Sequence, residues 1–190
     1  MSPKSWHSCL ASVKHGQDTE RPIHERSFKA GEVKPMFEDA IMLSIQSAIA
    51  TLQRGERDAA RHQLVAIWAA IEHDPMALHE CVLSHFMADT QDEVVDELSW
   101  DRRSLAAALR CTDAEVKEHH GGLSIAGFLP SLHLNLGDDY LRLGDRKACE
   151  VHLGAGVAAS EHLPNTPYAN MIRAGLEHLA EHLRTATDPI

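Results

Sequence analysis

From Met36 onward, apolar residues recur at intervals of three and four, the spacing that places them on one face of an α-helix. The first run extends from Phe37 to Leu52 and stops before Gly55, and a second run covers 57–72. No segment shows the sustained alternation of apolar and polar residues that is typical of a half-buried strand. The pattern therefore predicts an all-α fold.

Helix-start signals divide the rest of the chain. A short polar side chain that precedes a proline or lies three residues before a glutamate satisfies the free N–H groups of a first helical turn. The fourth predicted helix buries an apolar face made by Val94, Val95, Leu98, Leu105 and Leu109. The start signals predict helix starts at Asp74-Pro75, Thr90–Glu93, Thr112–Glu115 and Thr166-Pro167, and a sixth helix is expected to begin at Asp145, after the break at Gly144.

The sequence contains an internal repeat. Thr51–Pro75 and Tyr140–Pro164 align without gaps at an offset of 89 residues, and 11 of their 25 positions are identical. Self-similarity at a fixed period indicates a repeat architecture. Residues 76–109 fit between the two copies as a diverged helix pair. We expect a short α-solenoid of about three antiparallel helix pairs, with the seventh helix as a C-terminal cap.

The last predicted pair resembles a tetratricopeptide repeat, and the weaker resemblance of the whole chain covers roughly 36–184. Small residues at its key positions would let two helix backbones approach closely. The positions that carry the resemblance are Leu136-Gly137, Tyr140, Gly144-Asp145, Ala148, Ala155 and Pro164.

The resemblance implies a non-catalytic scaffold or adaptor that binds a protein or peptide on the concave face of its first helices. The register of the middle pair is not fixed by the sequence, and core packing is the alternative role for the apolar members of this face. The implied binding residues are Met42, Ile45, Ile49, Gln53, His79, Phe86, Asp89, Leu134, Asp138 and Arg142.

Charge separates the chain into two parts. The formal net charge is −10, while residues 1–36 carry +2 and residues 37–190 carry −12. An acidic body repels phosphate backbones, so we expect no nucleic-acid partner and favour a basic protein or peptide. Solubility alone is the other explanation of the charge. Residues 1–35 lack periodicity and form a leader that is either flexible or loosely packed on the helical domain of residues 36–190.

Apolar stretches and cysteines bear on the cellular compartment of the protein. No apolar stretch is long enough to cross a membrane, and we expect no secretory signal because the first residues lack an apolar run. The four cysteines form no C-x-x-C pair, which favours free thiols in a reducing cytoplasm. A homodimer remains an alternative if the last helix leaves an apolar face uncovered.

Fourteen histidines raise a second function class, a small metal-binding protein or metalloenzyme that uses zinc or another divalent metal. His178, Glu181 and His182 match the H-x-x-E-H pattern of some zinc peptidases, but only eight residues remain to supply a further ligand. A second candidate set is His79, Cys81 and His85 on the third helix. Its missing ligand would come from His119, His120 or His133.

Overall fold

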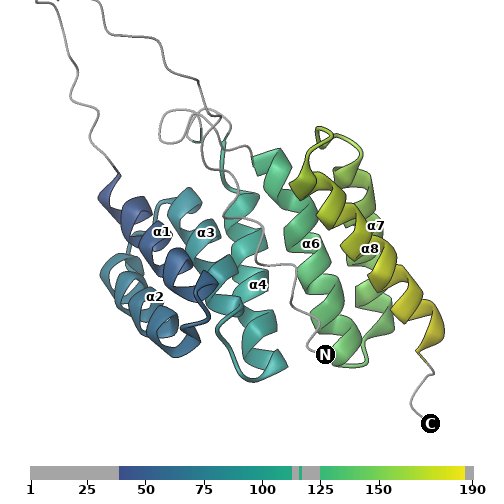
Figure 1. Cartoon of the computed structure of the whole chain (residues 1–190), viewed down its shortest axis with the longest axis horizontal. Helices are drawn as coiled ribbons and strands as arrows, with labels where there is room; N and C mark the ends of the chain where they lie inside the picture. Colours follow the sequence, from purple (N-terminus) through teal and green to yellow (C-terminus); the bar gives the residue numbers. More distant parts are fainter. Residues whose placement is uncertain (1–38, 113–115, 117–124, 187–190) are drawn as a thin grey trace, which may run out of the picture.

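The computed structural model describes residues 39–112, 116 and 125–186, and all regular secondary structure in these ranges is helical. Figure 1 shows the helices following one another along the longest axis of the molecule. The all-α prediction is confirmed for this part of the chain, while the leader of residues 1–35 lies outside it. The helices are α1 (Ala40–Gln53), α2 (Arg57–Ile71), α3 (Ala77–Ala88), α4 (Val94–Ala108), α6 (Ile125–Arg142), α7 (Arg146–Ser160) and α8 (Pro167–Thr185).

Helices that are adjacent in sequence pack together in space. α1 packs against α2, α3 against α4, and α6 against α7. α4 also contacts α6, and α8 covers both α6 and α7. Among the described helices, none has the length and apolar content needed to cross a bilayer.

The repeat in the sequence is also a repeat in the structure. α2 and α7 are both 15 residues long, and they begin at Arg57 and Arg146, 89 residues apart. Each follows a tight turn whose glycine has a left-handed backbone, with φ of 83° at Gly55 and 82° at Gly144. Glycine adopts this conformation without the steric penalty of a side chain. The two helix–turn–helix units therefore have the same local design.

Two of the predicted helix starts are confirmed by their caps. The Asp145 side chain accepts a hydrogen bond of 2.9 Å from the Ala148 N–H at the start of α7. The Thr166 hydroxyl accepts one of 3.2 Å from the Ala169 N–H, with Pro167 as the first residue of α8.

Two other starts were predicted too early. α3 begins at Ala77 rather than directly after Asp74, and its N-cap is Met76. α4 begins at Val94, without a side-chain cap. The Thr90 hydroxyl instead donates a hydrogen bond of 2.7 Å to the Met87 carbonyl oxygen, so it closes the preceding helix. The start predicted at Thr112–Glu115 falls mostly outside the described residues.

The apolar core has two main parts. The buried members of the first come from α1, α2 and α3, including Ile45, Leu64 and Leu83, together with Val116. The second is formed mainly by α6, α7 and α8, around Cys149 and Leu176. A smaller cluster from α3, α4 and α6 joins them.

Candidate functional site

Three buried carboxylates meet at the contact between α4 and α6. Glu97 and Asp101 lie one turn apart on α4, and Asp139 projects from α6. Their side chains are almost fully buried, and one oxygen from each lies within 4.8 Å of the others. We call Glu97, Asp101 and Asp139 the acidic cluster. It is the only such group of three metal-ligating side chains within the residues that the structure describes.

Two side chains of α6 hold the acidic cluster in place. The Arg142 guanidinium lies 2.9 Å from a Glu97 carboxylate oxygen and 3.4 Å from an Asp139 oxygen. It also lies 3.5 Å from Asp138 on its own helix. The Asn135 amide donates a hydrogen bond of 3.3 Å to Asp101. The guanidinium thus balances part of the buried negative charge, and the neutral amide donates a hydrogen bond to a carboxylate oxygen.

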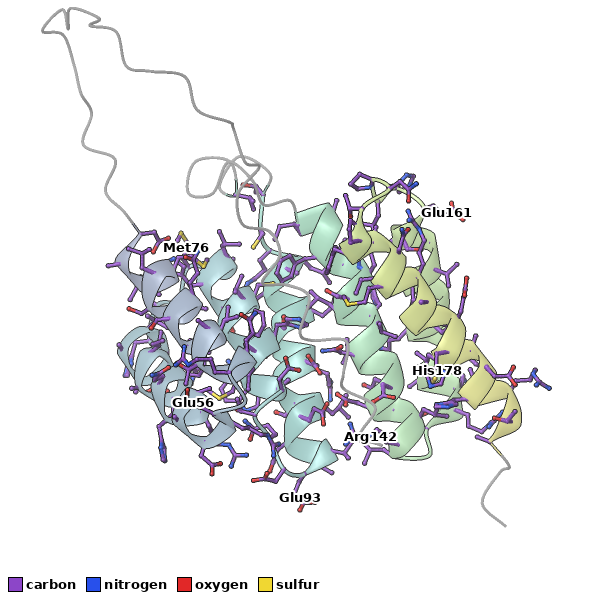
Figure 2. The ribbon with its side chains drawn as sticks, in the orientation of Figure 1. Glu56, Met76, Glu93, Arg142, Glu161 and His178 are labelled. Carbon is purple, nitrogen blue, oxygen red and sulfur yellow. The ribbon has the colours of Figure 1, made fainter. Side chains whose placement is uncertain are left out.

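Arg142 forms the exposed edge of this site. Figure 2 shows it near the C-terminal end of α6. Its side chain is 30% exposed, whereas the three carboxylates beneath it are covered. The His85 ring from α3 lies behind the cluster, with Nδ1 3.9 Å from an Asp101 oxygen. Chemically, the site is suited to a cation, because carboxylate oxygens line it and a cationic side chain already lies against them.

Four of the ten residues of the proposed concave face lie in the core of the fold. Met42, Ile45 and Phe86 belong to the first core cluster, and Leu134 belongs to the second. They are 0–4% exposed, so core packing, and not contact with a ligand, accounts for these four side chains.

The other members of that face lie apart from one another. Ile49 packs against the first core cluster and Gln53 is exposed at the end of α1. His79 is buried on α3, and Asp89 caps the C-terminus of that helix. Asp138 and Arg142 are the two members that the structure places at the acidic cluster, whose three carboxylates are not among the residues predicted from the sequence.

The proposed set of His79, Cys81 and His85 does not form a three-ligand site. The Nε2 atom of His79 lies 2.6 Å from Asp39, while Cys81 contacts Ser104 of α4. Burial raises the pKa of Cys81 to about 12, despite its hydrogen bond with Ser104, so in the metal-free chain its thiol is protonated. Of the suggested further ligands, His119 and His120 lie outside the described residues.

The H-x-x-E-H segment lies on the exposed face of α8 (Figure 2). The rings of His178 and His182 are close, with centroids 3.9 Å apart. Glu181 pairs with Arg184 at 2.6 Å, as expected for an ion pair on a solvated helix face.

Comparison with known proteins identifies no relative of this chain. No family model, no curated protein and no solved structure matches it. Function is therefore inferred from the geometry of the described residues.

Proposed function

We propose that the chain is a tetratricopeptide-like scaffold that binds a basic segment of a partner protein at the acidic cluster. In this proposal the helix pairs α1–α2, α3–α4 and α6–α7 form a short solenoid, with α8 as the capping helix. The observation that carries the proposal is the convergence of Glu97, Asp101 and Asp139 on one point between two successive pairs.

The contacts of Arg142 illustrate how such a segment is recognised. Its guanidinium lies within 3.5 Å of oxygens from Glu97, Asp138 and Asp139. A lysine or arginine of the partner takes the same place when the Arg142 side chain swings out into solvent. The net charge of −12 on residues 37–190 adds long-range attraction for a basic segment.

The experiment is fluorescence anisotropy with labelled peptides rich in lysine and arginine. Acidic peptides and neutral peptides of equal length serve as controls. We expect the basic peptides alone to bind, with an affinity that falls as salt rises. The double variant Glu97→Gln/Asp139→Asn should weaken binding by at least about tenfold, since loss of one partner of a buried ion pair costs about 2–5 kcal/mol.

A matched control separates the site from overall charge. The double variant Glu150→Gln/Glu177→Gln removes the same number of charges from exposed positions on α7 and α8. It should bind nearly as well as the unmodified chain. Equal weakening by both double variants, or no binding of basic peptides at all, would refute the proposal.

A second candidate function is binding of a hard divalent cation such as Mg²⁺, Mn²⁺ or Ca²⁺. It is favoured by the mutual distances of the three carboxylate oxygens, which are compatible with a single ion. Calorimetric titration with each ion distinguishes the two candidates. Saturable binding of an ion that is lost in Glu97→Gln/Asp139→Asn, without peptide binding, would favour the metal.

A further inference from the structure

Two histidines face each other where α6 and α7 pack together. The Nδ1 atoms of His133 and His152 are 3.0 Å apart, and their ring centroids are separated by 5.3 Å. The Tyr140 ring stacks on His152 at a centroid distance of 5.4 Å and an interplanar angle of 14°. Two imidazole nitrogens are thus held within contact distance, with an aromatic ring against one of them.

Each histidine lies beside a glycine of the opposite helix. His133 precedes Gly137 by four residues on α6, and His152 precedes Gly156 by four residues on α7. A Cβ atom at Gly156 would lie 3.3 Å from the Cβ of His133, and one at Gly137 would lie 3.9 Å from the Cβ of His152. The absence of a Cβ at Gly156 therefore lets His133 lie close to α7, while the Cβ of His152 would be in ordinary contact with a side chain at Gly137.

The distance between the nitrogens suits the coordination of one metal ion. With metal–nitrogen bonds of about 2.0–2.1 Å, two nitrogens lie about 3 Å apart at the right angle of a square-planar Cu²⁺ or Ni²⁺ site and about 3.3 Å apart at the tetrahedral angle of zinc. Burial lowers the pKa of both imidazoles, and the charge of His152 adds to the effect at His133. The rings are therefore held in the neutral form that ligates metals.

We propose that His133 and His152 form a two-histidine site for a late first-row divalent ion, namely Zn²⁺, Ni²⁺ or Cu²⁺. Imidazole nitrogen suits these ions, in contrast to the oxygen ligands of the acidic cluster. The site lies in the α6–α7 contact and is independent of the function proposed for the α4–α6 contact.

The coordination of the ion is completed by water. No other described histidine, cysteine or acidic side chain places a ligand atom within 4.8 Å of both nitrogens. Cys149, one turn from His152 on α7, is fully buried in the second core cluster and does not join the two nitrogens as a ligand. The remaining positions of the ion are thus open to solvent or to a donor atom of another molecule.

Isothermal titration of the untagged chain with Zn²⁺ tests the site. The measurements use a background of His178→Gln/His182→Gln, because that exposed pair is itself able to chelate an ion. We expect one ion per chain in this background. Adding either His133→Gln or His152→Gln should weaken the affinity for Zn²⁺ by at least about tenfold. Loss of a residue that only hydrogen-bonds a ligand already lowers metal affinity by about 10- to 100-fold, and loss of a ligand should cost no less. Adding His62→Gln, at an exposed position of α2, should change nothing.

The unmodified chain provides a test that does not depend on variants. Nuclear magnetic resonance that correlates imidazole protons and nitrogens reports which ring nitrogens bind Zn²⁺. We expect the Nδ1 resonances of two rings to shift together, and assignment to His133 and His152 supports the site. Shifts confined to other histidines, or equal affinity with and without the His133→Gln and His152→Gln changes, would overturn the proposal.

Discussion

Arg57 and Arg146 make the same contact in two different places. Each is the first residue of the second helix of a pair, and they lie 89 residues apart. Arg57 donates a hydrogen bond of 3.3 Å to the carbonyl of Asp89, the C-cap residue of α3. Arg146 donates one of 2.7 Å to the carbonyl of Ala186, the C-cap residue of α8. In both cases the arginine ties its pair to the end of the helix that follows.

This contact should stabilise the two ends of the molecule unequally. Arg57 also donates to the Gln91 carbonyl and pairs with Asp92 at 2.7 Å. We expect Arg57→Ala to lower the free energy of unfolding by about 1–2 kcal/mol, with little of this from the exposed ion pair. Arg146→Ala should cost less, about 0.5–1 kcal/mol, because its hydrogen bond to the Ala186 carbonyl is exposed to solvent. Urea unfolding followed by circular dichroism measures both values.

A third arginine provides the control for this comparison. Arg184 is 71% exposed and pairs with Glu181 on its own helix, so Arg184→Ala should change stability by less than about 0.5 kcal/mol. If Arg57→Ala were as mild as Arg184→Ala, the contact with the α3 C-terminus would have no role in stability.

Two glycines of α7 should respond in opposite ways to alanine. A Cβ atom at Gly154 would meet nothing within 4 Å, so Gly154→Ala should raise stability by about 0.5–1 kcal/mol through the better helix propensity of alanine. A Cβ atom at Gly156 would lie 2.8 Å from the Leu176 side chain and 3.3 Å from the Cβ of His133. Gly156→Ala should therefore cost about 1–3 kcal/mol by overpacking. Thermal melts measure the shift in melting temperature of each variant, and the two variants carry the same chemical change in the same helix. Two shifts of the same sign would contradict the close packing of α7 against α6 and α8.

The local design of the helix pairs could be predicted from the sequence because its signals are local. Thr166 caps its helix as predicted, Asp145 lies at a predicted helix start and is the N-cap there, and Gly55 and Gly144 form equivalent turns. Each of these signals acts through hydrogen bonds or backbone angles within four residues. Thr90 failed as a helix start because its hydroxyl has a competing acceptor one turn earlier, at the Met87 carbonyl.

The acidic cluster could not be predicted from the sequence, because the residues that allow Glu97 and Asp101 to be buried lie on α6 and not on α4. The apolar pattern of this helix predicted that Val95 and Leu109 face the core, yet they are 64% and 72% exposed. The face that packs on α6 instead carries Glu97 and Asp101. Burial of these acids depends on Asn135 and Arg142, more than 30 residues further along the chain. The one local signal is their spacing of four residues, which places both acids on the same face.

The two facing histidines should make the fold less stable in mild acid. Burial lowers the pKa of His133 and His152 below the ordinary value of 6.5, so the unfolded chain binds more protons than the folded chain in this range. Stability is then fully present above about pH 6.5 and falls as pH drops from there toward the folded pKa values, by at most about 1.4 kcal/mol per pH unit for each proton. Urea unfolding at pH 7.5 and 5.5 measures this loss, with all other conditions held constant.

Two variants test whether the histidine pair causes the loss. In His133→Gln/His152→Gln the loss should be smaller, whereas His62→Gln at an exposed position should match the unmodified chain. An unchanged pH dependence in the double variant would mean that the histidine pair is not the group that titrates.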